Sequence, residues 1–169
     1  MMKRLASLEG FGTLRLDLRP LRLVDASALR DLSDHPAIVS AIPFLSTPFS
    51  LSDARSLIHR NESGEDCFFG ASTREPPVLV CVVGAHLRGA KEIEIGYWVG
   101  ASHQGKGLAT EAALAVIAVL RREFPSFRIG AECRPENAAS WRVLEKLGFR
   151  PTGRKGTRAG RKLLSLGPG

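Results

Sequence analysis

The residues whose types and spacing could do chemistry centre on a glycine-rich turn in the middle of the chain. Residues 100–110 read GASHQGKGLAT, follow a strand-like stretch and open a helix-like one. Small residues let the backbone approach a ligand closely. The unpaired N–H groups of a first helical turn, aided by the helix dipole, favour an anion such as phosphate. The alternative is a tight turn that needs glycine only for its backbone angles, and the turn alone does not separate the two.

Two nucleotide-binding motifs come close to this turn, and neither fits it. The P-loop pattern G-x4-G-K-[ST] ends in a hydroxyl residue that holds Mg²⁺. Gly107 stands at that position, and no later apolar strand ends in the aspartate that would hold the ion. The dinucleotide fingerprint also fails, because its third glycine is missing. The sequence therefore disfavours nucleotide hydrolysis and dinucleotide binding.

Two carboxylates precede the turn on a strand-like segment, EIEIGYWV at Glu92–Val99. Side chains two residues apart in a strand share a face. Neighbouring carboxylates favour proton uptake by one of the pair, as a general base requires. Glu94 is the candidate base, acting through water, and Glu92 is the weaker candidate. The alternative is that one or both face solvent or pair with arginine.

The elements that must position these residues form a mixed pattern of strands and helices. Alternation, β-branched runs and helical spacing predict them, with Asp25 and Asn137 as helix N-caps and a bulge at Gly96. The order predicts an α/β fold with one mixed sheet and helices on its faces. The expected strands are 13–20, 67–72, 78–87, 92–99, 127–133, 149–152 and 162–166; the expected helices are 24–32, a short one within 33–48, 50–59, 106–124 and 137–147.

Length and composition narrow the class of protein. The 169 residues favour a single domain, residues 1–169. The net charge is +7, but the basic C-terminal segment (residues 150–169) holds six basic and no acidic residues, so the rest of the chain is nearly neutral. Scattered histidines and three separated cysteines predict no metal site. The lack of a ~20-residue apolar run and of a secretory signal predicts a cytoplasmic protein that does not enter the membrane.

Three blocks of the sequence, in order, resemble the Rim-type N-acetyltransferases of the GNAT superfamily. Residues 104–109 (QGKGLA) are similar to the superfamily motif Q/R-x-x-G-x-G/A. Residues 94–99 resemble the family's E-I-G-Y-W-L strand, residues 105–112 its G-K-G-Y-A-T-E-A, and residues 137–149 its N-x-x-S-x-R-V-L-E-K-x-G-F. The resemblance covers roughly residues 13–153, so the blocks support one another.

The resemblance implies a fold and a cofactor. The GNAT fold has a mostly antiparallel central sheet with one parallel strand pair and helices on both faces. Acetyl-CoA would lie against the 92–99 strand, with its pantetheine on backbone groups and its pyrophosphate on the amides of the turn. The implied cofactor-binding residues are Trp98, Val99, Gln104, Gly105, Lys106, Gly107, Leu108, Ala109, Thr110 and Asn137.

The resemblance also bears on the leaving group. Many GNAT enzymes use a tyrosine of the last helix to protonate the thiolate, and Leu144 stands there in this chain. Ser140 is the nearest substitute, one helical turn after Asn137, so that both can face one ligand. Ser140 and Glu94 are thus the two candidate catalytic residues. The alternative for Ser140 is a helix-start residue that bonds backbone.

The implied function is acetyl transfer from acetyl-CoA to a primary amine, by direct transfer in a ternary complex. The acceptor is either a protein N-terminus or a small molecule. Dimers are common in the family, so a homodimer is one expectation. The basic C-terminal segment suits an acidic partner or a ribosomal setting. Two alternatives stay open: an inactive acyl-CoA sensor, which the missing tyrosine would suit, and a nucleic-acid-binding module.

Overall fold

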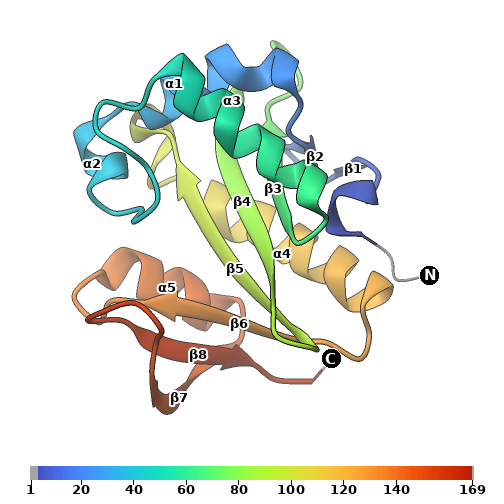
Figure 1. The fold of residues 1–169 in the computed structure, drawn as a ribbon, viewed down its shortest axis with the longest axis vertical. Helices are drawn as coiled ribbons and strands as arrows, with labels where there is room; N and C mark the ends of the chain where they lie inside the picture. The colour runs from blue at the N-terminus through green and yellow to red at the C-terminus, as the bar shows by residue number, and fades with distance from the viewer. Residues whose placement is uncertain (1–3, 169) are drawn as a thin grey trace.

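The computed structural model describes residues 4–168, which form a single eight-stranded sheet flanked by helices (Figure 1). Four 3₁₀ turns, at Leu5–Ser7, Leu23–Asp25, Arg60–Ser63 and Ala101–His103, join the longer elements. The strands are β1 (Phe11–Gly12), β2 (Asp17–Pro20), β3 (Asp66–Ser72), β4 (Leu79–Arg88), β5 (Glu92–Val99), β6 (Arg128–Cys133), β7 (Phe149–Lys155) and β8 (Lys162–Leu166). The helices are α1 (Ala26–Ser33), α2 (Pro36–Val39), α3 (Leu51–His59), α4 (Leu108–Glu123) and α5 (Ala138–Lys146).

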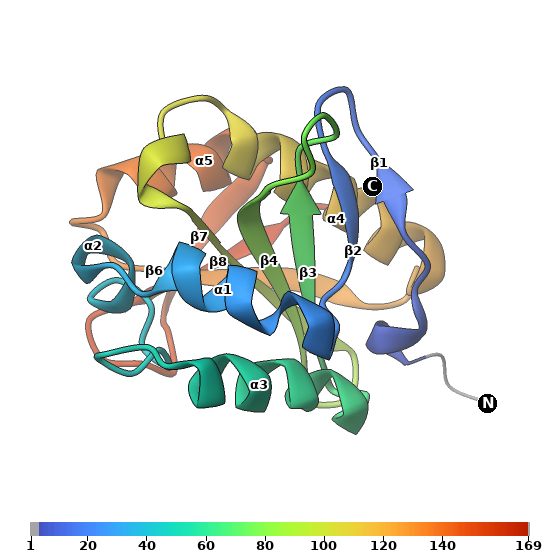
Figure 2. The ribbon, with the colours of Figure 1, turned by 90° about the horizontal axis from the view of Figure 1, so that it is seen from above.

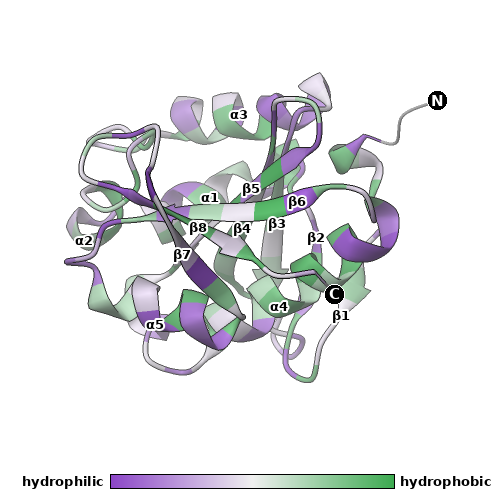
Figure 3. Ribbon diagram, turned by 90° about the horizontal axis from the view of Figure 1, so that it is seen from below, coloured by the Kyte–Doolittle hydropathy of each residue, from purple (hydrophilic) through white to green (hydrophobic). Residues whose placement is uncertain are grey.

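The strand order is β1-β2-β3-β4-β5-β6-β8-β7, and every neighbouring pair is antiparallel except β5 with β6. Helices α1 and α3 cover one face of the sheet, and α4 and α5 cover the other (Figure 2). This arrangement confirms the predicted mixed α/β sheet with one parallel pair. The hydrophilic β7 closes one edge, and all its residues after Phe149 are exposed (Figure 3).

Two apolar clusters, one on each face, hold the layers together. Ile93 and Ile95 of β5 point into the cluster under α4 and α5, whereas Trp98 of the same strand points into the cluster under α1 and α3. Both clusters follow from strand alternation, since successive side chains leave opposite faces of a sheet. The strand β5 therefore contributes to both cores while its carboxyl end reaches the glycine turn.

The parallel pairing between β5 and β6 is short. The register joins only Glu92 to Arg128, Ile93 to Ile129 and Glu94 to Gly130. Beyond Glu94 the two strands diverge (Figure 1). The hydrogen-bond ladder between β5 and β6 therefore stops after Glu94, the predicted base, and leaves a gap in the middle of the sheet.

Three local predictions are wrong. The side chain of Asp25 does not cap α1; it accepts from Arg22 N–H at 2.8 Å and pairs with Arg19 at 2.7 Å. The bulge expected at Gly96 does not form, because the β4–β5 register runs without a shift and sets Gly96 opposite Gly84. The strand expected at 13–20 is a hairpin instead: Thr13 N–H donates to Leu16 O at 2.8 Å, and only Asp17–Pro20 continues as strand β2. The residues of this turn also alternate between apolar and polar side chains, so the alternation could not distinguish the turn from a strand.

Candidate active site

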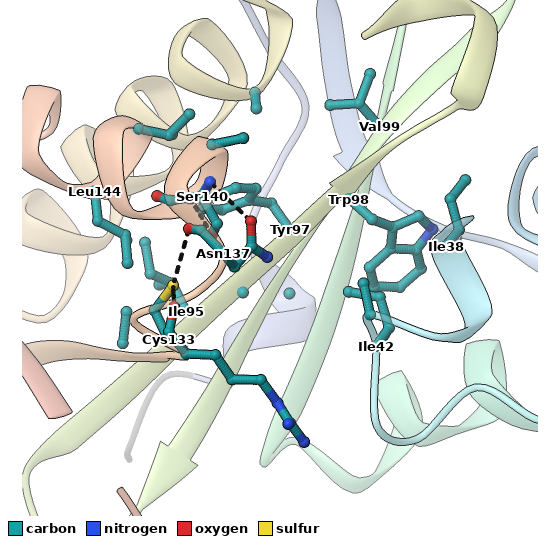
Figure 4. A pocket seen from close by; sticks show the side chains of 18 of the residues that line it. Ile38, Ile42, Ile95, Tyr97, Trp98, Val99, Cys133, Asn137, Ser140 and Leu144 are labelled. Atoms are coloured by element: carbon teal, nitrogen blue, oxygen red, sulfur yellow. Dashed lines mark hydrogen bonds between the residues drawn. The ribbon is translucent and has the colours of Figure 1, made fainter. Parts of the chain in front are cut away.

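A cavity of about 750 Å³ opens where β5 and β6 diverge (Figure 4). Its walls come from β5, the glycine turn, the first turns of α4 and α5, the end of β6, the loop after α2 and the C-terminal hairpin, β7–β8. Of the predicted site residues, the cavity is lined by Glu94, Trp98, Val99, Gln104, Gly105, Gly107, Leu108, Ala109, Thr110, Asn137 and Ser140. Lys106 does not line it, and its Nζ lies 3.4 Å from Ser102 O.

The backbone of β5 is unpaired along this opening. Gly100 N–H donates to Val80 O at 3.0 Å, so the even-numbered residues of β5 bond β4. The odd-numbered residues therefore face β6, as the 2.9 Å bond from Arg128 N–H to Lys91 O shows at the start of the strand. Since β6 has diverged, the backbone of Tyr97 and Val99 is left without a strand partner on that side. Val99 O accepts from Gln104 Nε2 at 3.2 Å.

Trp98, which the resemblance placed at this edge, uses its own backbone differently. It lies opposite Val82 in the β4 ladder. Its indole N–H donates to Ser33 Oγ at 2.9 Å, and the ring points away from α5 toward Ile38 and Ile42 (Figure 4). The free backbone groups next to it belong to Tyr97, a residue that the sequence alone did not place in the site.

The glycine turn presents N–H groups to the cavity. Gly105 and Gly107 both have φ of 75°, a conformation that favours glycine. Helix α4 begins at Leu108 with no side-chain cap, and Glu111 N–H is bonded to Gly107 O at 3.1 Å. The N–H groups of Leu108, Ala109 and Thr110 thus have no helical acceptor. Together with the positive end of the helix dipole they form an anion-binding wall.

A carboxylate in the same helical turn is held away from this wall. Glu111 Oε1 accepts from Arg15 N at 2.8 Å and Thr13 Oγ1 at 2.7 Å, and Oε2 accepts from Arg15 Nε at 2.6 Å. Burial raises the pKa of Glu111, but these hydrogen bonds outweigh burial and hold it below its usual value. Arg15 Nη1 also donates to Lys106 O at 2.9 Å, so Arg15 bonds both the glycine turn and the first turn of α4.

The two predicted carboxylates separate in the structure. Glu94 lines the cavity, its side chain is 14% exposed, and its Oε1 accepts from Arg158 Nη2 at 2.7 Å. Glu92 is 53% exposed, pairs with Arg128 at 2.6 Å and lies outside the cavity wall. Arg158 also bonds Glu132 Oε2 at 3.1 Å. The basic C-terminal segment therefore supplies a residue of the site.

Ser140 forms a polar pair with the strand. Asn137 caps α5 by accepting from Ser140 N–H at 3.2 Å, which confirms the predicted cap. Tyr97 Oη lies 3.0 Å from Ser140 Oγ and donates to Ser140 O at 3.0 Å (Figure 4). Burial raises the pKa of Tyr97, so the phenol stays protonated. Leu144, at the position of the missing tyrosine, is buried in the core.

Comparison with known proteins identifies the family. Residues 15–150 match the family model described as an acetyltransferase (GNAT) domain.

The chain belongs to the GNAT acetyltransferase family. It is 30% identical over 142 residues to the uncharacterized N-acetyltransferase YnaD of Bacillus subtilis (strain 168), a match that covers 83% of this chain and 82% of YnaD. A GNAT acetyltransferase of Bacillus anthracis superposes with a TM-score of 0.80 at 25% identity, covering 93% of this chain and 97% of the other. Mycobacterium smegmatis RimJ, solved in complex with CoA-disulfide, superposes with a TM-score of 0.77 at 24% identity, covering 95% of this chain and 88% of RimJ. The predicted acetyltransferase class and GNAT fold are confirmed, and RimJ shares that fold.

Other classes of site find little support in this GNAT acetyltransferase. Within residues 4–168, no three histidine, cysteine or acidic side chains gather as metal ligands, and no helix could cross a membrane. The three cysteines are free and buried, and burial raises the pKa of the Cys81 thiol to about 12. The side chains that line the cavity include the carboxylate of Glu94, the hydroxyl of Ser140 and the imidazole of His86.

Proposed function

We propose that this GNAT acetyltransferase moves the acetyl group of acetyl-CoA to a primary amine by direct transfer in a ternary complex. One observation carries the proposal: an anion-binding turn, an unpaired strand edge and a carboxylate line the same cavity. The diphosphate of acetyl-CoA would bind the turn, its extended pantetheine chain would bind the strand edge, and the acceptor amine would meet the carboxylate. Direct transfer requires both reactants to be held together, which one continuous cavity permits.

Each part of the cavity has a role in this reaction. The N–H groups of the turn bind the diphosphate. The backbone of Tyr97 and the N–H of Val99, both without a strand partner, bond the pantetheine amides and offer donors to the acetyl oxygen as it gains charge. Glu94 attracts the ammonium and takes its first proton through water. Ser140, backed by the Tyr97 hydroxyl, gives a proton to the departing thiolate.

The acceptor end of the cavity is bounded by the basic C-terminal segment. Arg158 and Arg161 line it, and Arg161 Nη2 donates to Ala41 O at 3.1 Å, which ties the C-terminal hairpin to the loop after α2. An amine that carries a nearby acidic group suits this surface. A protein N-terminus and a small-molecule amine are the two acceptor classes. Cytoplasmic location, a homodimer and a ribosomal partner stay predictions.

A thiol-release assay with acetyl-CoA and a panel of peptides and small amines tests the proposal. We expect release of CoA that depends on the amine, with one acetyl group added to the acceptor by mass spectrometry. Binding of acetyl-CoA without turnover across a broad panel would support an inactive sensor. Membership of an acetyltransferase family argues against that alternative.

Replacing Arg15 with glutamine should weaken acetyl-CoA binding about tenfold. The change removes the ion pair with Glu111 and the bond to Lys106 O. The Glu111 carboxylate, still bonded to Thr13 Oγ1 and to the backbone N–H at position 15, then has no cation beside it and repels the diphosphate. Calorimetric titration with acetyl-CoA measures the effect. Arg122→Gln is the matched control, because it breaks an ion pair with Glu123 at the other end of α4. Equal losses in both variants would remove Arg15 from the site.

Replacing Ser140 with alanine should lower kcat about tenfold and leave the KM for acetyl-CoA nearly unchanged. The alanine keeps the helix but removes the hydroxyl next to Tyr97 Oη. The thiolate must then leave without a proton donor at hydrogen-bond distance. Steady-state kinetics with a good acceptor measure the split between kcat and KM, and an unchanged kcat would exclude Ser140 as the acid.

A further inference from the structure

A buried histidine that the proposed mechanism does not use faces the acceptor end of the cavity. His86 of β4 lines the cavity, and its side chain is 5% exposed. The β4–β5 register sets it directly opposite Glu94, with both side chains on the same face of the sheet. Its ring packs edge-on against Phe68, with ring centroids 5.1 Å apart.

The orientation of this imidazole is fixed by a carboxylate behind it. His86 Nδ1 lies 2.5 Å from Asp66 Oδ1, and Asp66 Oδ2 accepts from Arg60 Nε at 2.9 Å. Burial raises the pKa of Asp66, but the hydrogen bonds from His86 and Arg60 outweigh it and hold the pKa below its usual value. Asp66 is therefore ionised and can only accept hydrogen bonds. The neutral ring must carry its hydrogen on Nδ1, which leaves the lone pair on Nε2.

The Nε2 atom lies over a hollow in the sheet. A Cβ on Gly84 would meet it at 2.6 Å, so the ring covers this glycine. Gly96, the cross-strand partner of Gly84, has no atom within 4 Å of a Cβ position. Because Gly96 has no side chain, open space is left on this face of β5 beside the His86 ring. Among the described residues, no hydrogen-bond donor reaches Nε2.

We propose that His86, oriented by Asp66, is a second base of the acetyl transfer. The inference rests on the proposed function. An ammonium carries three protons and the amide product one, so two must leave the nitrogen. Glu94 takes the first through water. As the C–N bond forms and the C–S bond breaks, His86 Nε2 takes the second, while the thiolate receives its proton from Ser140. Ser140 regains its proton through water from Glu94, and the imidazolium passes its proton to water, so both bases and the serine are restored and one proton is released for each turnover.

The kinetic test compares kcat from pH 5.5 to 9.5, at saturating acetyl-CoA and acceptor, in the wild type, His86→Gln and Asp66→Asn. The charged groups next to the ring are Asp66, which pairs with Arg60, and the cross-strand Glu94, which pairs with Arg88 of β4 and Arg158 of the C-terminal hairpin. His86→Gln should lower kcat about 100-fold across this range, with acetyl-CoA affinity within about twofold of wild type.

Two further measurements separate a base from a structural residue. His59→Gln, which alters an exposed histidine paired with Glu62, should leave kcat unchanged. Imidazole ¹⁵N spectra of the protein without acetyl-CoA should show His86 with hydrogen on Nδ1, and Asp66→Asn should weaken that preference and lower kcat about tenfold. If His86→Gln does not fold, the ¹⁵N spectra and the kcat of Asp66→Asn test the inference in its place. Wild-type kinetics in His86→Gln, or hydrogen on Nε2 in the wild type, would overturn the inference alone. A wild type that acetylates no amine would overturn it together with the proposed function.

Discussion

Replacing Gly107 with alanine is expected to weaken acetyl-CoA binding by about tenfold or more. Gly107 has φ of 75°, and a side chain in this conformation costs roughly 1–2 kcal/mol. The backbone can escape the strain by rotating toward negative φ, which turns the N–H groups at the start of α4 away from the cavity. Calorimetric titration with acetyl-CoA measures the loss, since 1.4 kcal/mol corresponds to about a factor of ten in affinity.

Gly153→Ala is the matched control for this variant. Gly153 in β7 has φ of 80°, no atom lies within 4 Å of its Cβ position, and it does not line the cavity. Both substitutions should therefore lower the melting temperature by a similar amount, while only Gly107→Ala changes affinity. Equal affinities in the two variants would show that the backbone of the turn does not bind the cofactor.

Replacing Glu94 with glutamine is expected to lower kcat about 100-fold, with the largest deficit at acidic pH. Glutamine has the size of glutamate and keeps an oxygen that can accept from Arg158 Nη2, but it cannot take a proton. Fewer acceptor amines are neutral at low pH, so the need for a base is greatest there. The pH dependence of kcat, measured with saturating substrates, reports the effect.

The neighbouring carboxylate gives this variant its control. Glu92→Gln changes an exposed residue of the same strand that pairs with Arg128 outside the cavity, and it should leave kcat nearly unchanged. If Glu94→Gln kept the wild-type profile, Glu94 would have no role as a base. If both variants lost activity alike, the defect would lie in β5 rather than in proton transfer.

The parts of the site that the sequence predicted are local in the chain. The strand Glu92–Val99 has the expected bounds, and Asn137 caps the helix that it was expected to cap. The glycine turn opens a helix as its spacing predicted, with the start moved to Leu108 by the positive φ of Gly107. In each case the signal and the structure lie within one turn or one strand, where propensity and capping act directly.

The parts that the sequence did not predict depend on contacts between distant residues. Arg15 meets Glu111 across 96 positions, and Arg158 meets Glu94 across 64. The charged residues of each pair lie in segments with no pattern that links them, so only the folded sheet brings them together. His86 lies within a buried apolar strand, and no sequence pattern links it to Asp66, 20 positions earlier, which contacts its ring.

A crystal structure of the protein with bound CoA tests the central claim most directly. We expect the diphosphate oxygens within hydrogen-bond distance of backbone nitrogens between residues 105 and 110, and the pantetheine amides on the backbone of Tyr97 and Val99. A complex that placed the diphosphate on side chains elsewhere, with the glycine turn free, would contradict the account.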